Sequence, residues 1–245
     1  MVDRPFVSVV VPVHNGGRYL AEALSSLFAQ SRRPDQIVVV DDGSTDETPS
    51  ILDEHGDRLT RLRQPRAGPA AARNAGVQAA TGDFVAFLDA DDVCHPERLA
   101  RQVAAFSTRP SLDVCLTRIQ NFWVPELREE AELLSDHVLS RPRPGTVTQS
   151  GMVRRQLLEE IRFDPGLLTG EDQDWLVRAA EKKKEIQILP EILIRRRMHA
   201  GNVTRLEKGR MDDDMMVWVK RSLDRRRKDG GRPVPIRIPR TGDGA

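Results

Sequence analysis

Residues 6–30 read FVSVVVPVHNGGRYLAEALSSLFAQ, and this stretch decides the fold class. It begins with Phe6–Val11, a continuous apolar run rich in valine, which is typical of a strand buried on both faces. Tyr19–Gln30 follows, with leucine and alanine residues at helical spacing on one side. A buried strand that leads directly into an amphipathic helix predicts an α/β protein in which helices cover a parallel sheet.

The alternation of strand and helix continues through the first half of the chain. Further strands are predicted at Ile37–Val40, Leu59–Arg63, Phe84–Leu88 and Leu112–Ile119. Helices are predicted at Pro69–Ala80 and from Pro96 to Phe106. One more helix is expected to begin at Ser44, which forms a capping box with Glu47. Right-handed crossovers between such strands give a mostly parallel sheet flanked by helices. Ligands of these sheets bind beyond the carboxyl ends of the strands, so residues at those ends are candidates for a site.

The pattern changes after about Ile119, where a C-terminal region without the regular alternation is predicted. Its expected elements are a short acidic helix at Glu126–Ser135, a loop at Arg141–Gly145, helices at Met152–Glu160 and Asp172–Lys183, a strand at Ile186–Arg195 interrupted by Pro190, and a last helix at Met211–Arg227. Residues 230–245 are rich in Gly, Pro and Arg, and we expect them to be disordered.

Composition and charge argue against several classes of protein. A formal net charge of +1 over 245 residues gives no general argument for nucleic-acid binding. The two cysteines, Cys94 and Cys115, have neither disulfide-framework nor zinc-site spacing, which indicates a reducing compartment and a cytoplasmic location. No stretch approaches the roughly 20 apolar residues of a transmembrane helix, and the first apolar run is too short for a signal peptide. The basic run Arg225–Lys228 leaves a peripheral contact with a membrane surface open.

Acidic residues follow the predicted strand Phe84–Leu88 directly. Asp89, Asp91 and Asp92 lie within four positions, and alternate carboxylates at a strand end can converge on one hard divalent cation. Mg²⁺ usually completes its shell with water and substrate phosphate oxygens, so a sparse set of protein ligands is expected. The structural alternative is a helix N-cap, which explains one aspartate well but three in four positions poorly.

Two further segments allow both a structural and a functional interpretation. Asp41 and Asp42 follow the strand Ile37–Val40 and precede a Gly-Ser pair, so they fit a turn with a helix cap, or a contact with the base or ribose of a nucleotide. Gly68–Gly76 (GPAAARNAG) predicts a helix whose small residues permit close packing. Arg73 on that helix is either a surface residue or a group that reaches toward a nucleotide or phosphate.

Four stretches in this order resemble family 2 glycosyltransferases of the GT-A fold. They are VSVVVPVHNGGRYLAEALSSLFAQ (7–30), IVVVDDGSTDET (37–48), GPAAARNAG (68–76) and GDFVAFLDADD (82–92), and LLTGEDQDWLVRAAE (167–181) and RRRMHAGNVT (195–204) extend the resemblance more loosely. It implies a Rossmann-like GT-A fold with a C-terminal acceptor-side region. It also implies an inverting transfer of a sugar from a nucleotide-diphosphate donor, most often a UDP-sugar, to an acceptor hydroxyl, with Mn²⁺ or Mg²⁺ as cofactor.

The resemblance implies a donor site built from residues of the first half. Pro12 and Asp42 would line the nucleotide-base pocket, with Asp42 as the base contact. Asp89 and Asp91 would belong to the family's DXD motif, in which Asp91 ligates the metal and Asp89 holds the ribose or supports the metal. In this setting Arg73 would bind the nucleotide sugar as well.

The resemblance implies that the rest of the reaction is carried by the second half. Asp172 matches the family's catalytic base, with Glu171 beside it, and it opens a predicted helix whose N-terminal dipole favours a negative charge. His199 matches a histidine that approaches the metal and the diphosphate from a closing C-terminal loop, so it is a second candidate metal ligand.

These roles divide the chain into three parts. Residues 1–118 would bind the nucleotide sugar, 119–204 would bind the acceptor and carry the base, and 205–245 would form a C-terminal helix and a tail. The acceptor stays open between a carbohydrate, a lipid-linked molecule, a protein and a small molecule. Asn202–Thr204 is formally a glycosylation sequon, which has no meaning in a cytoplasmic chain.

Two other interpretations fit part of the sequence. FVAFLDADDV (84–93) also fits a phosphatase of the haloacid dehalogenase type with Asp89 as its nucleophile, but Asp41 and Asp42 precede this motif and GPAAARNAG is left unexplained. A catalytically inactive GT-A binding module is the second alternative, because a fold alone does not prove an activity. Metal-dependent hydrolysis of the donor without an acceptor would separate an enzyme from such a module.

Overall fold

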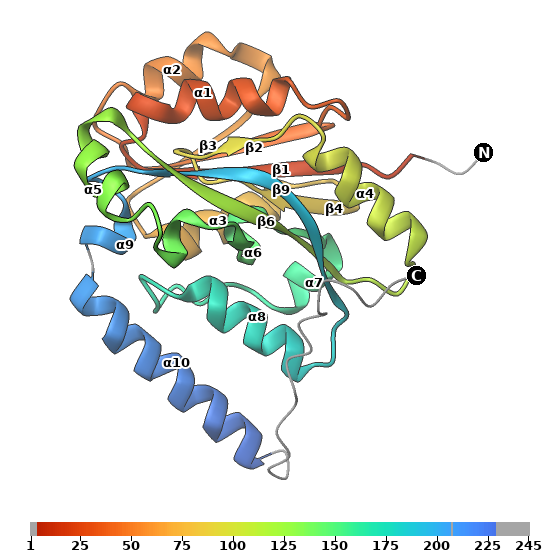
Figure 1. Ribbon diagram of the computed structural model, residues 1–245. Helices are drawn as coiled ribbons and strands as arrows, with labels where there is room; N and C mark the ends of the chain where they lie inside the picture. The colour runs from red at the N-terminus through yellow and green to blue at the C-terminus, as the bar shows by residue number, and fades with distance from the viewer. Residues whose placement is uncertain (1–3, 207, 229–245) are drawn as a thin grey trace.

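The computed structural model describes residues 4–206 and 208–228, and the tail expected to be disordered at 230–245 lies outside them (Figure 1). The strands are β1 (Val7–Val13), β2 (Gln36–Asp42), β3 (Thr60–Gln64), β4 (Phe84–Phe87), β5 (Val93–Cys94), β6 (Val114–Trp123), β7 (Arg143–Pro144), β8 (Met152–Arg154) and β9 (Ile186–Met198). The α-helices are α1 (Gly17–Phe28), α2 (Thr48–Glu54), α3 (Pro69–Ala79), α4 (Arg98–Thr108), α5 (Arg128–Leu133), α6 (Val147–Ser150), α7 (Arg155–Glu160), α8 (Glu171–Glu181), α9 (Val203–Leu206) and α10 (Lys208–Lys228).

The described strands form one nine-stranded sheet in the order β3-β2-β1-β4-β8-β6-β9-β5, with β7 paired to β6. The first four strands of this order are parallel, with Val11 opposite Val39 and Val9 opposite Ala86. Beyond β4 the sheet is mixed, because β8 is antiparallel to both of its neighbours while β6 and β9 are parallel to each other. The predicted α/β fold with a largely parallel first half is confirmed, and the carboxyl ends of β1, β2 and β4 lie at the same edge.

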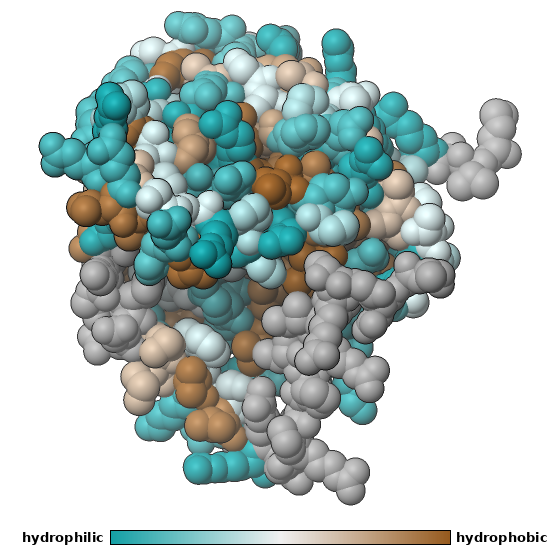
Figure 2. Space-filling model, viewed as in Figure 1, coloured by the Kyte–Doolittle hydropathy of each residue, from teal (hydrophilic) through white to brown (hydrophobic). Residues whose placement is uncertain are grey.

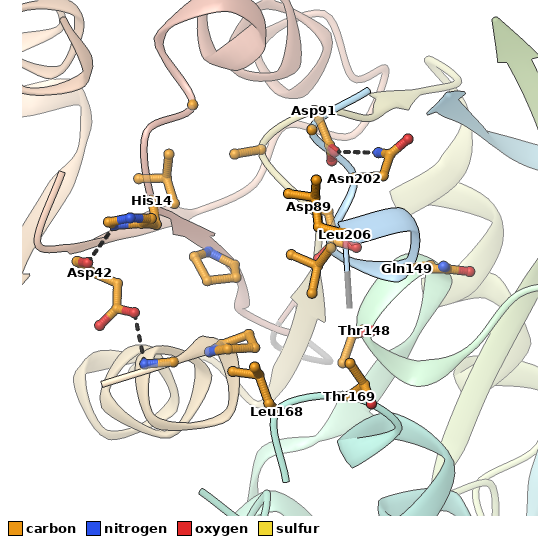
Figure 3. A pocket seen from close by; sticks show the side chains of 18 of the residues that line it. His14, Asp42, Asp89, Asp91, Thr148, Gln149, Leu168, Thr169, Asn202 and Leu206 are labelled. Atoms are coloured by element: carbon orange, nitrogen blue, oxygen red, sulfur yellow. Dashed lines mark hydrogen bonds between the residues drawn. The ribbon is translucent and has the colours of Figure 1, made fainter. Parts of the chain in front are cut away.

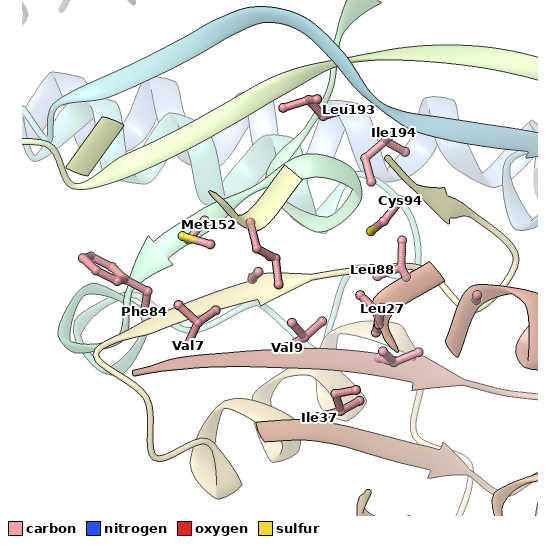
Figure 4. Close-up of a cluster of buried hydrophobic side chains, with 14 of the residues drawn as sticks. Val7, Val9, Leu27, Ile37, Phe84, Leu88, Cys94, Met152, Leu193 and Ile194 are labelled. Atoms are coloured by element: carbon pink, nitrogen blue, oxygen red, sulfur yellow. The ribbon is translucent and has the colours of Figure 1, made fainter. Parts of the chain in front are cut away.

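Alternate residues of β1 pack into two hydrophobic layers, one on each face of the sheet. Val9 and Val11 belong to the layer that also contains the apolar sides of α1 and α4 (Figure 4). Val10 points to the opposite layer, which is completed by α3, α7 and α8. In α3 a Cβ atom on Gly76 would lie 2.4 Å from Val10 Cγ1, so this glycine lets the helix approach the sheet closely.

Two predicted helix starts are wrong, one after β2 and one before α7. Ser44 does not open a helix, because α2 begins at Thr48 and the Ser44 hydroxyl instead accepts a hydrogen bond from the Asn15 amide at 2.9 Å. Met152–Glu160 is not one helix, because Met152–Arg154 forms β8 between β4 and β6 and the helix begins at Arg155. Pairing with two distant strands overrides the local helical preference of these residues.

Two segments of the C-terminal region also differ from expectation. The loop predicted at Arg141–Gly145 contains the short strand β7, which pairs with β6. Strand β9 continues through Pro190, although the register against β6 shifts between Leu116 and Arg118. A bulge accommodates a proline in a strand because the ladder hydrogen bond that proline cannot donate is already interrupted there.

Helix α10 packs beside α8 and closes one side of the molecule (Figure 1). Its Asp214 carboxylate accepts hydrogen bonds from the amides of Leu168 and Thr169, which precede α8. Four of the described side chains of α10 are apolar and exposed: Met215, Met216, Val217 and Leu223. Figure 2 shows apolar groups among polar ones where α10 lies. No helix of the described residues is both long and apolar enough to cross a membrane.

Arg98 of α4 is fully buried and holds the ends of two strands together. Its guanidinium donates to the carbonyl oxygens of Phe87 at 2.8 Å and Gly151 at 3.2 Å. We expect Arg98→Leu to lower the free energy of unfolding by about 3 kcal/mol, because two buried carbonyl groups lose a charged donor. Arg101→Leu on the same helix is the control, since Arg101 is exposed and its pair with Glu97 should contribute no more than about 0.5 kcal/mol. Urea denaturation measures both, and equal effects would contradict this role.

Candidate active site

A cavity of about 980 Å³ opens at the carboxyl ends of β1, β2 and β4 (Figure 3). Its size is at the upper end of the range for small-molecule sites. The seven residues proposed for the site come from six separate segments, and all of them line this cavity: Pro12, Asp42, Arg73, Asp89, Asp91, Asp172 and His199. The fold therefore brings residues of the first and second halves of the chain to one place.

Asp42, at the end of β2, binds the loop that precedes α3. Its carboxylate accepts hydrogen bonds from the Gln64 side chain at 2.7 Å and from the amides of Ala67 and Gly68, each at 2.8 Å. A carboxylate has about four acceptor positions, so these three bonds leave room for one further donor. The neighbouring Asp41 is also buried, but it accepts from the Ser44 amide and does not line the cavity.

Arg73 of α3 joins Asp89 to Glu171. One terminal nitrogen lies 2.8 Å from Asp89 Oδ1, and the other lies 2.5 Å from Glu171 Oε1. Burial raises the pKa of Asp89, although the positive charge of Arg73 opposes the shift. Burial likewise raises the pKa of Glu171 to about 7, again against the pull of Arg73. Both terminal nitrogens of Arg73 thus bind protein carboxylates. Arg73 is buried and not a surface residue, and its contact with a nucleotide or phosphate stays a prediction.

Asp91 faces a loop that follows β9. Its Oδ2 atom lies 2.9 Å from His199 Nε2 and accepts a hydrogen bond from Asn202 Nδ2 at 3.1 Å (Figure 3). Asn202 also donates to the Arg197 carbonyl and accepts from the His199 amide, so it ties this loop together. Asn202 was missed as a site residue, because its only signal in the sequence was a spacing of three from His199.

Asp92 belongs to the same acidic run but has a structural role. One of its carboxylate oxygens accepts a hydrogen bond from the Arg197 amide at 2.9 Å, which joins the start of β5 to the end of β9. Burial, together with the charges of Asp91 and Asp89, raises the pKa of Asp92 well above its usual value. No group of three or more His, Cys, Asp or Glu side chains within the described residues is arranged to hold a metal ion.

Asp172 lies in the first turn of α8, which begins at Glu171, one residue before the predicted start. Gly170 precedes the helix with a φ of 72°, a left-handed conformation that favours glycine. A Cβ atom on Gly170 would also lie 3.2 Å from Trp218 Nε1 of α10. Asp172 Oδ2 accepts a hydrogen bond from Thr148 Oγ1 at 3.3 Å. The Asp172 carboxylate therefore lines the same cavity as the residues that follow β4.

A family model described as Glycosyl transferase family 2 matches residues 8–162, which are more than half of the chain. The chain belongs to glycosyl transferase family 2. The match includes Asp42, Asp89 and Asp91 and ends before Asp172 and His199. This membership decides against the phosphatase interpretation, in which Asp89 would be a nucleophile, and Asp89 is instead paired with Arg73.

Curated members of the family match parts of this chain. An uncharacterized glycosyltransferase of Nostoc sp. is 42% identical over 106 residues, which are 42% of this chain and 33% of that protein. The poly(ribitol-phosphate) β-N-acetylglucosaminyltransferase TarS of Staphylococcus aureus is 30% identical over 196 residues, covering 74% of this chain and 34% of TarS. The chain thus spans about a third of the length of each of these two relatives.

Solved structures of glycosyltransferases share the fold. A crystal structure of S. aureus TarS in complex with UDP-GlcNAc has a TM-score of 0.67 and 24% identity, covering 88% of this chain and 66% of that one. A mannosyltransferase of Pyrobaculum calidifontis in complex with GDP-Man and Mn²⁺ has a TM-score of 0.65 and 21% identity, covering 95% of this chain and 67% of that one. The predicted GT-A fold is therefore confirmed for this family 2 chain.

Proposed function

We propose that this family 2 chain is an inverting glycosyltransferase that moves a sugar from a nucleotide-diphosphate donor, with a UDP-sugar as the first choice, to an acceptor hydroxyl. The observation that carries the proposal is the single cavity that Asp42, Asp89 and Asp91 share with Asp172. In this proposal residues 1–118 bind the donor, 119–204 bind the acceptor and carry the base, and 205–245 form a C-terminal extension.

The donor side of the cavity offers acceptors and shape for a nucleotide. Asp42 has one acceptor position left for a base N–H, and its loop contacts keep the carboxylate in place. Pro12 lines the same cavity and has no backbone N–H to donate. Asp89, held by Arg73, would accept from the ribose hydroxyls. Complexes of TarS with UDP-GlcNAc and of the Pyrobaculum enzyme with GDP-Man support a nucleotide-diphosphate sugar but differ in the nucleotide.

Asp91 and His199 fit a divalent cation. Asp91 Oδ2 and His199 Nε2 lie 2.9 Å apart, and both residues line the cavity. One carboxylate and one imidazole suit Mn²⁺ or Mg²⁺ that takes its other ligands from diphosphate oxygens and water. His199 Nε2 can ligate only without a proton, so metal bonds would replace its hydrogen bond with Asp91. The bound cation would neutralise the charge that develops on the departing diphosphate. The complex of the Pyrobaculum enzyme with Mn²⁺ supports this choice.

Asp172 would remove the proton of the acceptor hydroxyl. Its carboxylate lines the cavity while Thr148 holds it from the side, and it comes from a segment far in sequence from Asp91. Attack on the anomeric carbon from the side opposite the diphosphate inverts the configuration of the sugar. Because the base accepts the proton as the bond forms, a well-placed carboxylate contributes about 10²–10⁴-fold to the rate.

The test is a thermal unfolding series with UDP, GDP, dTDP, CDP and ADP, each with Mn²⁺, Mg²⁺ or EDTA. A ligand at about 100 times its dissociation constant should stabilise the fold by about 2.7 kcal/mol, and EDTA should abolish this gain. Absence of a metal-dependent shift with all five nucleotides would contradict the proposal. Release of free nucleotide from the matching nucleotide sugar in the absence of acceptor then separates an enzyme from an inactive binding module.

The acceptor and the location remain predictions. A carbohydrate, a lipid-linked molecule, a protein and a small molecule all present a hydroxyl that Asp172 could deprotonate. A cytoplasmic location rests on Cys94 and Cys115, which are both buried and unpaired.

A further inference from the structure

Arg73 connects parts of the site that come from different halves of the chain. It lies on α3, while Asp89 follows β4 and Glu171 is the first residue of α8. Glu171 is 98 residues away from Arg73 in the sequence, yet their side chains are 2.5 Å apart. Asp89 is a donor-side residue, and Glu171 is the neighbour of the proposed base Asp172. One guanidinium therefore spans the donor side and the start of the helix that carries the base.

This bridge is shielded from solvent and depends on the shape of the arginine side chain. Arg73 is only 5% exposed, and its Nε–H is buried without a hydrogen-bond partner among the described residues. A planar guanidinium presents its terminal nitrogens in a rigid fork, so it can hold two carboxylates at a defined separation. A lysine ammonium has the same charge but lacks this fork.

Stabilisation of α8 alone does not account for the bridge. The helix is anchored elsewhere, because Trp175 donates to the Ile161 carbonyl at 2.6 Å and Asp214 holds the segment before the helix. Buried ion pairs are also weak contributors to stability, since desolvation of both charges offsets much of their attraction. What Arg73 adds is a contact at the first residue of the helix, next to Asp172.

We propose that Arg73 is a positioning residue, which fixes the base Asp172 relative to the donor by holding Asp89 and Glu171 on one guanidinium. This inference rests on the proposed function. Displacement of a reacting group by about 1 Å can reduce a rate by about 10²-fold, so loss of the bridge should affect kcat even when the fold is intact.

The test compares Arg73→Met, Arg73→Lys, Glu171→Gln and the double variant Arg73→Met/Glu171→Gln, using hydrolysis of the nucleotide sugar that binds best. We expect both Arg73 variants to lower kcat by about 10²-fold. Their nucleotide affinity should also fall, because Asp89 loses its partner. Glu171→Gln should lower kcat by about tenfold and leave nucleotide affinity within about twofold of the wild type, since the Arg73–Asp89 pair remains.

The double variant distinguishes a shared role from two independent ones. If the two residues act through one another, its kcat should equal that of Arg73→Met, whereas independent effects would multiply. Arg178→Met is the matched control, because Arg178 pairs with Asp174 on α8 and does not line the cavity. It should leave kcat and nucleotide affinity unchanged. Should Arg73→Met fail to fold, Glu171→Gln alone carries the test.

A pH profile gives a readout that a purely structural role would not move. The charged groups that face Glu171 are Arg73, Asp172 and Asp89, and burial raises the pKa of Glu171 to about 7. As pH rises through this value Glu171 ionises and its ion pair with Arg73 forms, so wild-type kcat should rise with pH. Glu171→Gln, uncharged at every pH, should lose this rise, and a rise that persists would assign it to another group.

Different outcomes would overturn the proposed function and the positioning role of Arg73. A wild-type chain with neither metal-dependent nucleotide binding nor donor hydrolysis would overturn both. An active wild type whose Arg73→Met and Glu171→Gln variants keep wild-type kcat, or whose effects multiply in the double variant, would overturn the positioning role alone.

Discussion

Replacing Asp172 by asparagine is expected to lower kcat for sugar transfer or donor hydrolysis by about 10²–10⁴-fold. An amide cannot accept the proton of the attacking hydroxyl, but it keeps the shape of the side chain and can still accept from Thr148 Oγ1. Nucleotide affinity should change little, because the carboxylate is bonded to Thr148 and to the amide of Gln173 rather than to the donor-side residues. Steady-state kinetics with a nucleotide-binding titration measure both quantities.

Asp174→Asn is the control for this variant. Asp174 lies on the same helix and is also buried, but its carboxylate pairs with Arg178 at 2.7 Å and it does not line the cavity. This change should lower stability and leave kcat per folded molecule near the wild-type value. An Asp172→Asn chain with wild-type kcat would rule out Asp172 as the base and direct attention to Glu171.

Asp91→Ala is expected to remove the metal-dependent part of nucleotide binding. The wild-type chain should gain about 2.7 kcal/mol of stability at 100 times the dissociation constant of its nucleotide with Mn²⁺, and the variant should lose this gain. The physical reason is that His199 would be left as the only proposed protein ligand, and one imidazole holds a hard cation weakly. Thermal unfolding and isothermal titration, each with Mn²⁺ and with EDTA, measure the effect.

Asp53→Ala is a suitable control for the loss of one aspartate. Asp53 pairs with Arg61 on the surface, and its side chain is 76% exposed. The nucleotide response of this variant should match that of the wild type. Metal-dependent stabilisation that survives in Asp91→Ala would show that the cation is held elsewhere and would contradict the assignment of Asp91.

The first half of the fold could be predicted because its signals are local. A valine run predicted the strand that the structure has at Val7–Val13, and leucines at helical spacing predicted the helix at Gly17–Phe28. Asp42 and Asp89 were candidates for the same reason, since both belong to acidic runs that follow predicted buried strands. The carboxyl ends of parallel neighbours meet at one edge, so these candidates lie around one cavity.

Features that depend on distant partners could not be predicted. Met152–Arg154 has a helical pattern, yet it forms a strand because β4 and β6 offer backbone hydrogen bonds on both sides. Asn202 was part of a sequon without meaning, and its hydrogen bond to Asp91 spans 111 positions. The pairing of Arg73 with Glu171 likewise has no local signal, because neither residue is near the other in the sequence.

By itself, the sequence determined which residues are acidic, which of them follow buried strands or begin a helix, and thus the chemistry available to the site. Only the tertiary structure decided how each carboxylate is used. Asp91 lines the cavity, whereas the adjacent Asp92 accepts a hydrogen bond from the Arg197 amide. Asp172 and the adjacent Glu171 both line the cavity, and Glu171 also pairs with Arg73. The partners that make this distinction lie about 100 positions away along the chain, so only the folded packing of α3, α8 and β9 brings them together.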